Sequence, residues 1–134
     1  MSAANEYFVF VGTHAHNASE GIYVYRMDAL SGILTPAANP ANIEDSLFVV
    51  LDPSHHFLYA AVETYGSSGI YAGMVSAFSV DVSTGSLNFL NSQSSGGDGA
   101  CHMSVDATGT NLLVANYGSG TVSLLPIKPD GSLG

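Results

Sequence analysis

Short apolar segments alternate with turn-forming segments along the chain, and the apolar segments are rich in β-branched and aromatic residues. Segments of this length and composition are typical of β-strands. Turn residues bound them, as in Asp81-Val-Ser-Thr-Gly85. No window has apolar residues at helical spacing over three turns, so we predict an all-β fold without a substantial helix. The predicted strands are 8–11, 22–27, 47–51, 57–62, 74–80 and 112–115.

The strand pattern repeats along the chain. Leu58-Tyr-Ala-Ala61 corresponds to Leu112-Leu-Val-Ala115, 54 residues later. A second motif, Gly21 to Asp28, recurs at Gly73 to Asp81 and at Gly120 to Lys128. A period of about 50 residues built from short strands indicates a β-propeller or a related array. Many strands are apolar on both faces, which suits blades packed face to face.

The repeat divides the chain into blades at about 6–38, 44–94 and 99–134. The first unit starts at a second strand, and the last stops as a fourth strand begins. A closed propeller has about 4 to 8 blades, so we expect about two and a half four-stranded blades of one longer domain. Because blade faces and strand edges would stay uncovered, we predict that the isolated chain is insoluble, molten or swapped into oligomers.

The charge balance argues against several partners. Two basic residues, Arg26 and Lys128, stand against eleven acidic ones, which gives a formal net charge of −9. We therefore expect no nucleic-acid binding and no binding to an anionic membrane surface. No apolar run approaches the roughly 18 residues of a membrane span, and no signal-peptide pattern is present. The single cysteine, Cys101, has no basic neighbour that would activate it as a nucleophile.

His102 is the leading candidate for a functional side chain, because the preceding repeat has Phe48 at the corresponding position. In a propeller blade, the start of the innermost strand and the end of the second strand share a rim. His102 begins an innermost strand. Three further polar residues end second strands and are expected at the same rim: Glu63, Asn116 and Tyr117. Each also has a structural interpretation, as a residue that holds a loop, forms propeller scaffold or faces solvent.

Four other histidines fall into two pairs. His14 and His16 follow the first strand at the rim of His102, and in an extended segment they would share one face as a metal pair. No third ligand lies nearby, so we predict no metal site. His55 and His56 lie in a hairpin at the opposite rim, where we expect solvated side chains. The motifs of serine nucleophiles, phosphate loops and dinucleotide sites are missing from the sequence, so we expect no cofactor.

The run Gly99-Ala-Cys-His-Met-Ser-Val-Asp-Ala-Thr-Gly109, continued by Leu112-Leu-Val-Ala-Asn-Tyr-Gly118, resembles the β-propeller lactonases of the 6-phosphogluconolactonase type. In that family the first part reads like Gly-Pro-Cys-His-Leu-Ser-Val-Asp-Pro-Thr-Gly. Gly12-Thr13, Glu20 to Tyr25 and Leu58 to Glu63 also agree, so the resemblance covers essentially the whole chain. Alanines replace two prolines of the family pattern, but the histidine is retained.

The resemblance implies a seven-bladed β-propeller and a cytoplasmic enzyme that hydrolyses 6-phospho-D-glucono-1,5-lactone to 6-phospho-D-gluconate. Because no serine nucleophile is evident, we predict direct attack of water on the ester carbonyl, with His102 and Glu63 as catalytic residues. The expected substrate-binding residues are Asn116, Tyr117 and His14. The expected partner is a small sugar lactone, and the oligomeric state is left open.

Two alternatives remain at this stage: a related propeller enzyme that forms or opens muconate-type lactones, and a non-enzymatic interaction platform. A phosphorylated substrate would need cations or backbone N–H groups. Arg26 lies inside a strand away from the rim of His102, and Lys128 lies at the opposite rim. We therefore expect the phosphate-binding cations outside residues 1–134 and no lactonase activity from this chain alone.

Overall fold

The computed structural model describes residues 5–14, 20–65 and 71–134, and in these ranges the chain forms strands and no helix. The all-β prediction is therefore confirmed, and no membrane-spanning helix occurs in the described part. The strands are β1 (Glu6–Val11), β2 (Ile22–Asp28), β3 (Leu34–Ala41), β4 (Ser46–Leu51), β5 (Phe57–Tyr65), β6 (Tyr71–Val80), β7 (Leu87–Ser94), β8 (Ala100–Val105), β9 (Asn111–Asn116) and β10 (Thr121–Pro126).

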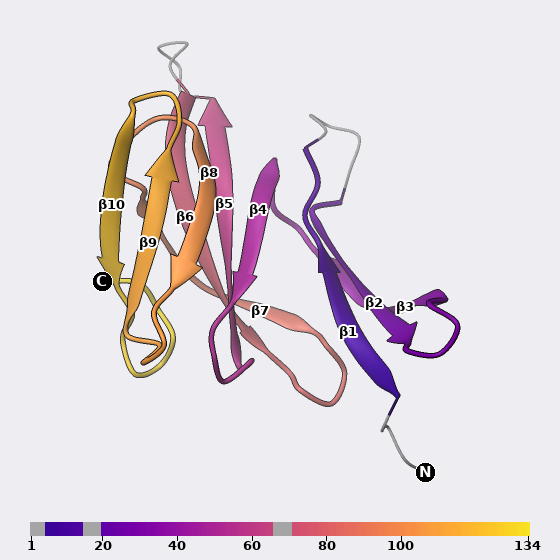
Figure 1. Cartoon of the computed structure of the whole chain (residues 1–134). Helices are drawn as coiled ribbons and strands as arrows, with labels where there is room; N and C mark the ends of the chain where they lie inside the picture. The colour runs from indigo at the N-terminus through magenta and orange to yellow at the C-terminus, as the bar shows by residue number, and fades with distance from the viewer. Residues whose placement is uncertain (1–4, 15–19, 66–70) are drawn as a thin grey trace.

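The strands form three antiparallel sheets in chain order: β1-β2-β3, β4-β5-β6-β7 and β8-β9-β10 (Figure 1). We interpret each sheet as one blade and call them blades 1, 2 and 3. The first sheet continues to Ala41, beyond the expected limit at residue 38. After β10, a single bridge pairs Ile127 with Leu133.

The strands predicted by residue range coincide with β1, β2, β4, β5, β6 and β9. The repeat, and not those ranges, indicated β8 and β10, and neither predicted β3 and β7. β3 contains Pro36 and Pro40, and β7 alternates few apolar residues with asparagine and serine. Both are outermost strands of their sheets. An edge strand tolerates proline because one side of its backbone has no strand to pair with, so this position explains the missing signal.

Two apolar clusters fill the spaces between neighbouring blades. Leu58, Ala60 and Val62 of β5 are buried in the cluster that includes Ile22 of blade 1. The intervening residues of the same strand are buried in the second cluster, which includes Met103, Leu112 and Val114 of blade 3. Side chains of a strand alternate between its faces, so β5 is apolar from Phe57 to Val62 because blade 2 packs against a neighbour on both sides.

Polar side chains tie blade 2 to the segment after β10. The hydroxyl of Tyr59 donates to the backbone oxygen of Gly131 at 2.9 Å, and burial raises the pKa of Tyr59 to about 12. The amide of Asn91 donates to the oxygen of Leu133 at 2.8 Å and accepts from its N–H at 2.9 Å. These ties hold the end of the chain against blade 2, which supports the position of blade 3.

One end of the molecule collects the candidate residues. β4 and β8 begin there, and β1, β5 and β9 end there (Figure 1). Gly12, just after β1, packs so closely on Ser46 that an added Cβ would lie 2.6 Å from the Ser46 backbone oxygen. We call this end the β4–β8 rim. It brings together chain segments that are distant in sequence.

Candidate functional site

The two innermost strands share a local irregularity at the β4–β8 rim. The register shifts between Ser46 and Phe48 in blade 2 and between Ala100 and His102 in blade 3. Beyond this β-bulge, Phe48 pairs with Ala61 and His102 pairs with Ala115. His102 is therefore the structural equivalent of Phe48, as the repeat predicts. A bulge changes the direction in which side chains project and is common next to active sites.

The rings of these two equivalent residues are in contact. Their centroids lie 4.6 Å apart with an angle of 44° between the planes. The His102 side chain is exposed and Phe48 is half-buried. Phe48 thus supplies an apolar neighbour on one side of the imidazole, and the His102 side chain is otherwise open to solvent.

Glu63 lies near the end of β5 and is half-buried. Its Oε1 is 3.7 Å from the point that a Cβ on Gly99 would occupy. Gly99 directly precedes β8 and has φ of +68°, a conformation that favours glycine. The carboxylate of blade 2 therefore lies beside the chain segment that leads to His102, at the same rim as the imidazole.

Backbone hydrogen bonds connect the segment before β8 to the segment after β9. The N–H of Tyr117 donates to the oxygen of Gly99 at 2.8 Å, and the N–H of Gly118 donates to the oxygen of Asp98 at 2.9 Å. The Tyr117 side chain is 85% exposed. Tyr117 therefore combines a fixed backbone with a phenol that is free to contact a ligand.

Asn116 is the last residue of β9 and is buried. It is only 2% exposed, and its amide nitrogen lies within hydrogen-bond distance of three oxygens, one in the segment between β7 and β8 and two on β10. These are the backbone oxygen of Ser95 at 3.1 Å and the hydroxyls of Thr121 at 3.3 Å and Ser123 at 3.2 Å. Its amide nitrogen thus connects neighbouring segments at the rim, and the assignment of Asn116 to substrate binding stays a prediction.

His14 follows β1 and lies next to Asp45, which directly precedes β4. His14 Nδ1 is 3.6 Å from Asp45 Oδ1, and the two side chains are 56% and 7% exposed. Asp45 has φ of +41°, unusual for a residue other than glycine. The hydrophobic pattern does not reveal Asp45. A signal does exist in the repeat, because Asp45 precedes Gly99 by the same 54 residues that separate Phe48 from His102.

His55 and His56 lie away from the other candidate residues. His55 and His56 are exposed in the hairpin between β4 and β5, at the end of blade 2 opposite the β4–β8 rim. His16 lies outside the described residues. Within the described residues, no group of three or more His, Cys, Asp or Glu side chains could hold a metal ion.

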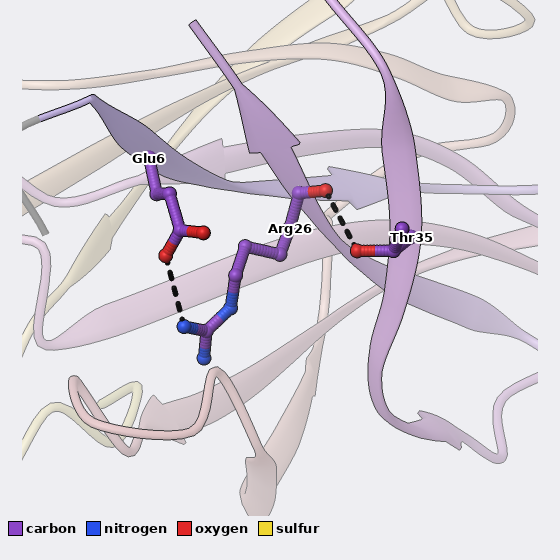
Figure 2. Close-up of polar contacts among 3 residues, drawn as sticks. All are labelled: Glu6, Arg26 and Thr35. Carbon is purple, nitrogen blue, oxygen red and sulfur yellow. Dashed lines mark hydrogen bonds and ion pairs between the residues drawn. The ribbon is translucent and has the colours of Figure 1, made fainter.

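Both basic residues lie away from the candidate site. Figure 2 shows Arg26 on β2 with its Nη1 3.0 Å from Glu6 Oε2, while the Thr35 hydroxyl donates to the Arg26 backbone oxygen at 3.5 Å. The guanidinium also lies 5.2 Å from the centre of the Phe8 ring. Lys128 follows β10 at the end opposite the β4–β8 rim and is exposed.

Comparison with known proteins places this geometry in a family. Residues 8–134 match the family described as "Lactonase, 7-bladed beta-propeller". The chain belongs to this family. The prediction that it forms part of a seven-bladed propeller is thereby confirmed, and the three sheets are successive blades of that architecture.

Individual relatives agree with this assignment. The chain is 34% identical over 128 residues to the 6-phosphogluconolactonase of Bacillus subtilis strain 168. The aligned region covers 96% of this chain and 35% of the relative. A putative 6-phosphogluconolactonase from Bacteroides fragilis has a TM-score of 0.88 at 28% identity, over 99% of this chain and 35% of that one. The periplasmic gluconolactonase of Pseudomonas aeruginosa has a TM-score of 0.85 at 30% identity, over 96% of this chain and 37% of that one. The chain thus spans about a third of these relatives.

Proposed function

We propose that the complete protein containing this chain hydrolyses a sugar lactone, with 6-phospho-D-glucono-1,5-lactone as substrate and 6-phospho-D-gluconate as product. The observation that carries the proposal is the imidazole of His102 at the bulge of an innermost strand, where the neighbouring blade has a phenyl ring. Glu63 from that neighbouring blade reaches the same rim. Relatives named as 6-phosphogluconolactonases support the choice of lactone.

Hydrolysis of a lactone needs a base for the attacking water, an acid for the leaving oxygen and a hold on the sugar. We assign the first two tasks to His102, since an imidazole accepts and donates protons near neutral pH. It takes a proton from water as the water oxygen bonds to the carbonyl carbon. It returns a proton to the ring oxygen as the ester C–O bond breaks. Glu63 orients the water, and Tyr117 contacts the sugar.

The experiment is an acid-release assay on the complete protein with 6-phosphogluconolactone, unphosphorylated glucono-1,5-lactone and a muconolactone. We expect the highest kcat/KM with the phosphorylated lactone and no turnover of the muconolactone. The rate in buffer alone corrects for spontaneous hydrolysis, and a His102→Ala preparation controls for contaminating hydrolases. Failure to exceed the buffer rate with either sugar lactone would refute the proposal.

The location in the cell belongs to the same proposal. We propose a cytoplasmic enzyme, although the Pseudomonas relative is described as periplasmic. Cell fractionation with antibody detection distinguishes the two compartments, and recovery of the protein in the periplasmic fraction would contradict the cytoplasmic assignment.

A further inference from the structure

Asp45 occupies a backbone position that the equivalent blade gives to glycine. Asp45 and Gly99 both directly precede an innermost strand and both have positive φ, +41° and +68° respectively. A residue with a Cβ is disfavoured in this region, although aspartate and asparagine tolerate it better than most. Glycine meets the backbone requirement in blade 3 without this cost, so the aspartate in blade 2 points to a task for its carboxylate.

The neighbour of that carboxylate is the imidazole of His14. The Asp45 side chain is 7% exposed, its Oδ1 lies 3.6 Å from His14 Nδ1, and the His14 side chain is 56% exposed. At 3.6 Å the pair is within ion-pair distance and beyond a hydrogen bond, and the negative charge favours a proton on the ring nitrogen that faces it. The pair therefore combines a buried carboxylate with an imidazole that is open to solvent.

We propose that Asp45 is a positioning residue for His14 in the lactone site. The Asp45 carboxylate holds the tautomer with a proton on Nδ1, so that Nε2 accepts a hydrogen bond from a hydroxyl group of the sugar lactone. This inference rests on the proposed function, because it assumes that a sugar binds at the β4–β8 rim. It gives His14 a defined binding role and adds a residue that does not itself touch the substrate.

A double-mutant cycle in the complete protein tests the pair. His14→Ala removes the acceptor, and Asp45→Asn removes the charge while retaining a side chain that tolerates positive φ. For each single variant we expect KM for the sugar lactone to rise about tenfold, the effect of losing one hydrogen bond of this kind, with kcat within about twofold. We expect the KM of the double variant to be no higher than the KM of His14→Ala, because Asp45 acts through His14.

Glu44→Gln is the matched control, because it removes the adjacent carboxylate, which is exposed. We expect it to leave KM unchanged. Additive effects of the two substitutions, an unchanged KM in Asp45→Asn, or an equal rise in Glu44→Gln would overturn the inference. Thermal unfolding of each variant identifies a KM change that is caused by misfolding. If the Asp45→Asn protein does not fold, Asp45 has a purely structural role and the inference is overturned. Absence of lactone hydrolysis in the wild type would instead refute the proposed function.

Discussion

At the bulge of β8, an imidazole replaces a phenyl ring while the strand keeps the pairing of its counterpart in blade 2. A phenylalanine at this point can only pack, as Phe48 does. The His102 ring packs against the Phe48 ring, with centroids 4.6 Å apart, and it also has nitrogen atoms that bind and release protons. A single change of residue type at this position therefore supplies the group that we propose for proton transfer, without a change of fold.

The prediction at this scale concerns His102 and Glu63. In the complete protein, His102→Ala should lower kcat/KM for the lactone by about 10²-fold or more, because it removes the proposed base and acid. Glu63→Gln should lower kcat by a smaller factor, since the amide still orients water but carries no charge. Steady-state kinetics on both variants measures these effects. His56→Ala, an exposed histidine at the opposite end, is the control and should retain wild-type kinetics.

Thermal unfolding checks the structural alternative for His102. The side chain is exposed, so its removal is expected to change stability by less than about 1 kcal/mol. A His102→Ala protein that is well folded and fully active would reassign the residue to loop support.

At the scale of the elements, the start of β8 depends on two glycines that meet across the rim. A Cβ on Gly99 would lie 2.9 Å from the N of Gly118. That close approach allows the hydrogen bonds from residues 117 and 118 to the segment before β8. The path of this segment decides where His102 lies relative to Glu63, so the site depends on a backbone contact as well as on its own side chains.

Gly99→Ala is therefore predicted to reduce both stability and activity. The substitution places alanine at positive φ and against the Gly118 backbone, with an expected loss of about 1 to 3 kcal/mol in unfolding free energy. Gly120→Ala is a matched control, because Gly120 has φ of +64° but nothing within 4 Å of an added Cβ. It should lose stability from the backbone alone and retain kcat/KM. Denaturant unfolding and lactone kinetics on both variants make the comparison, and equal activities would show that the contact does not position the site.

At the scale of the whole molecule, the blades bury one another and leave outer faces apolar. Val122 and Leu124 of β10 are 72% and 57% exposed on the face of blade 3 away from blade 2. In a closed propeller the next blade covers such a face. We therefore still predict that the isolated chain is insoluble, molten or oligomeric, and that it is inactive.

Charge is also distributed at this scale. The formal net charge is −9, and both basic residues lie away from the β4–β8 rim. Arg26 is already engaged by Glu6 and by the ring of Phe8. Neither cation therefore lies near the proposed site.

We accordingly predict that the double substitution Arg26→Gln and Lys128→Gln in the complete protein changes KM for the phosphorylated lactone by less than about twofold. Each substitution removes a charge that lies far from the proposed site, and salt screens the interaction of such a charge with the substrate. KM measured at two ionic strengths checks the expectation, and the unphosphorylated lactone is the control substrate. A KM that rises tenfold for the phosphorylated lactone alone would place one of these cations at the phosphate.

Much of the architecture could be predicted from the sequence, because strand patterning is local. Runs such as Phe57 to Val62 combine β-forming residues with turn residues at their ends, and the 54-residue offset exposes the repeat. Propeller topology then groups Glu63 and His102 at one rim. The outer strands β3 and β7 were not predicted, because an edge strand needs no continuous apolar pattern and tolerates proline.

Only the tertiary structure decided what each polar residue at the rim can reach. Asn116 and Tyr117 are adjacent in sequence, yet one is 2% exposed and the other 85%. Asp45 appears in the sequence as one acidic residue among eleven, and its contact with His14 joins blade 1 to blade 2. Secondary structure follows from neighbouring residues along the chain, whereas burial and contacts between blades depend on segments that are distant in sequence.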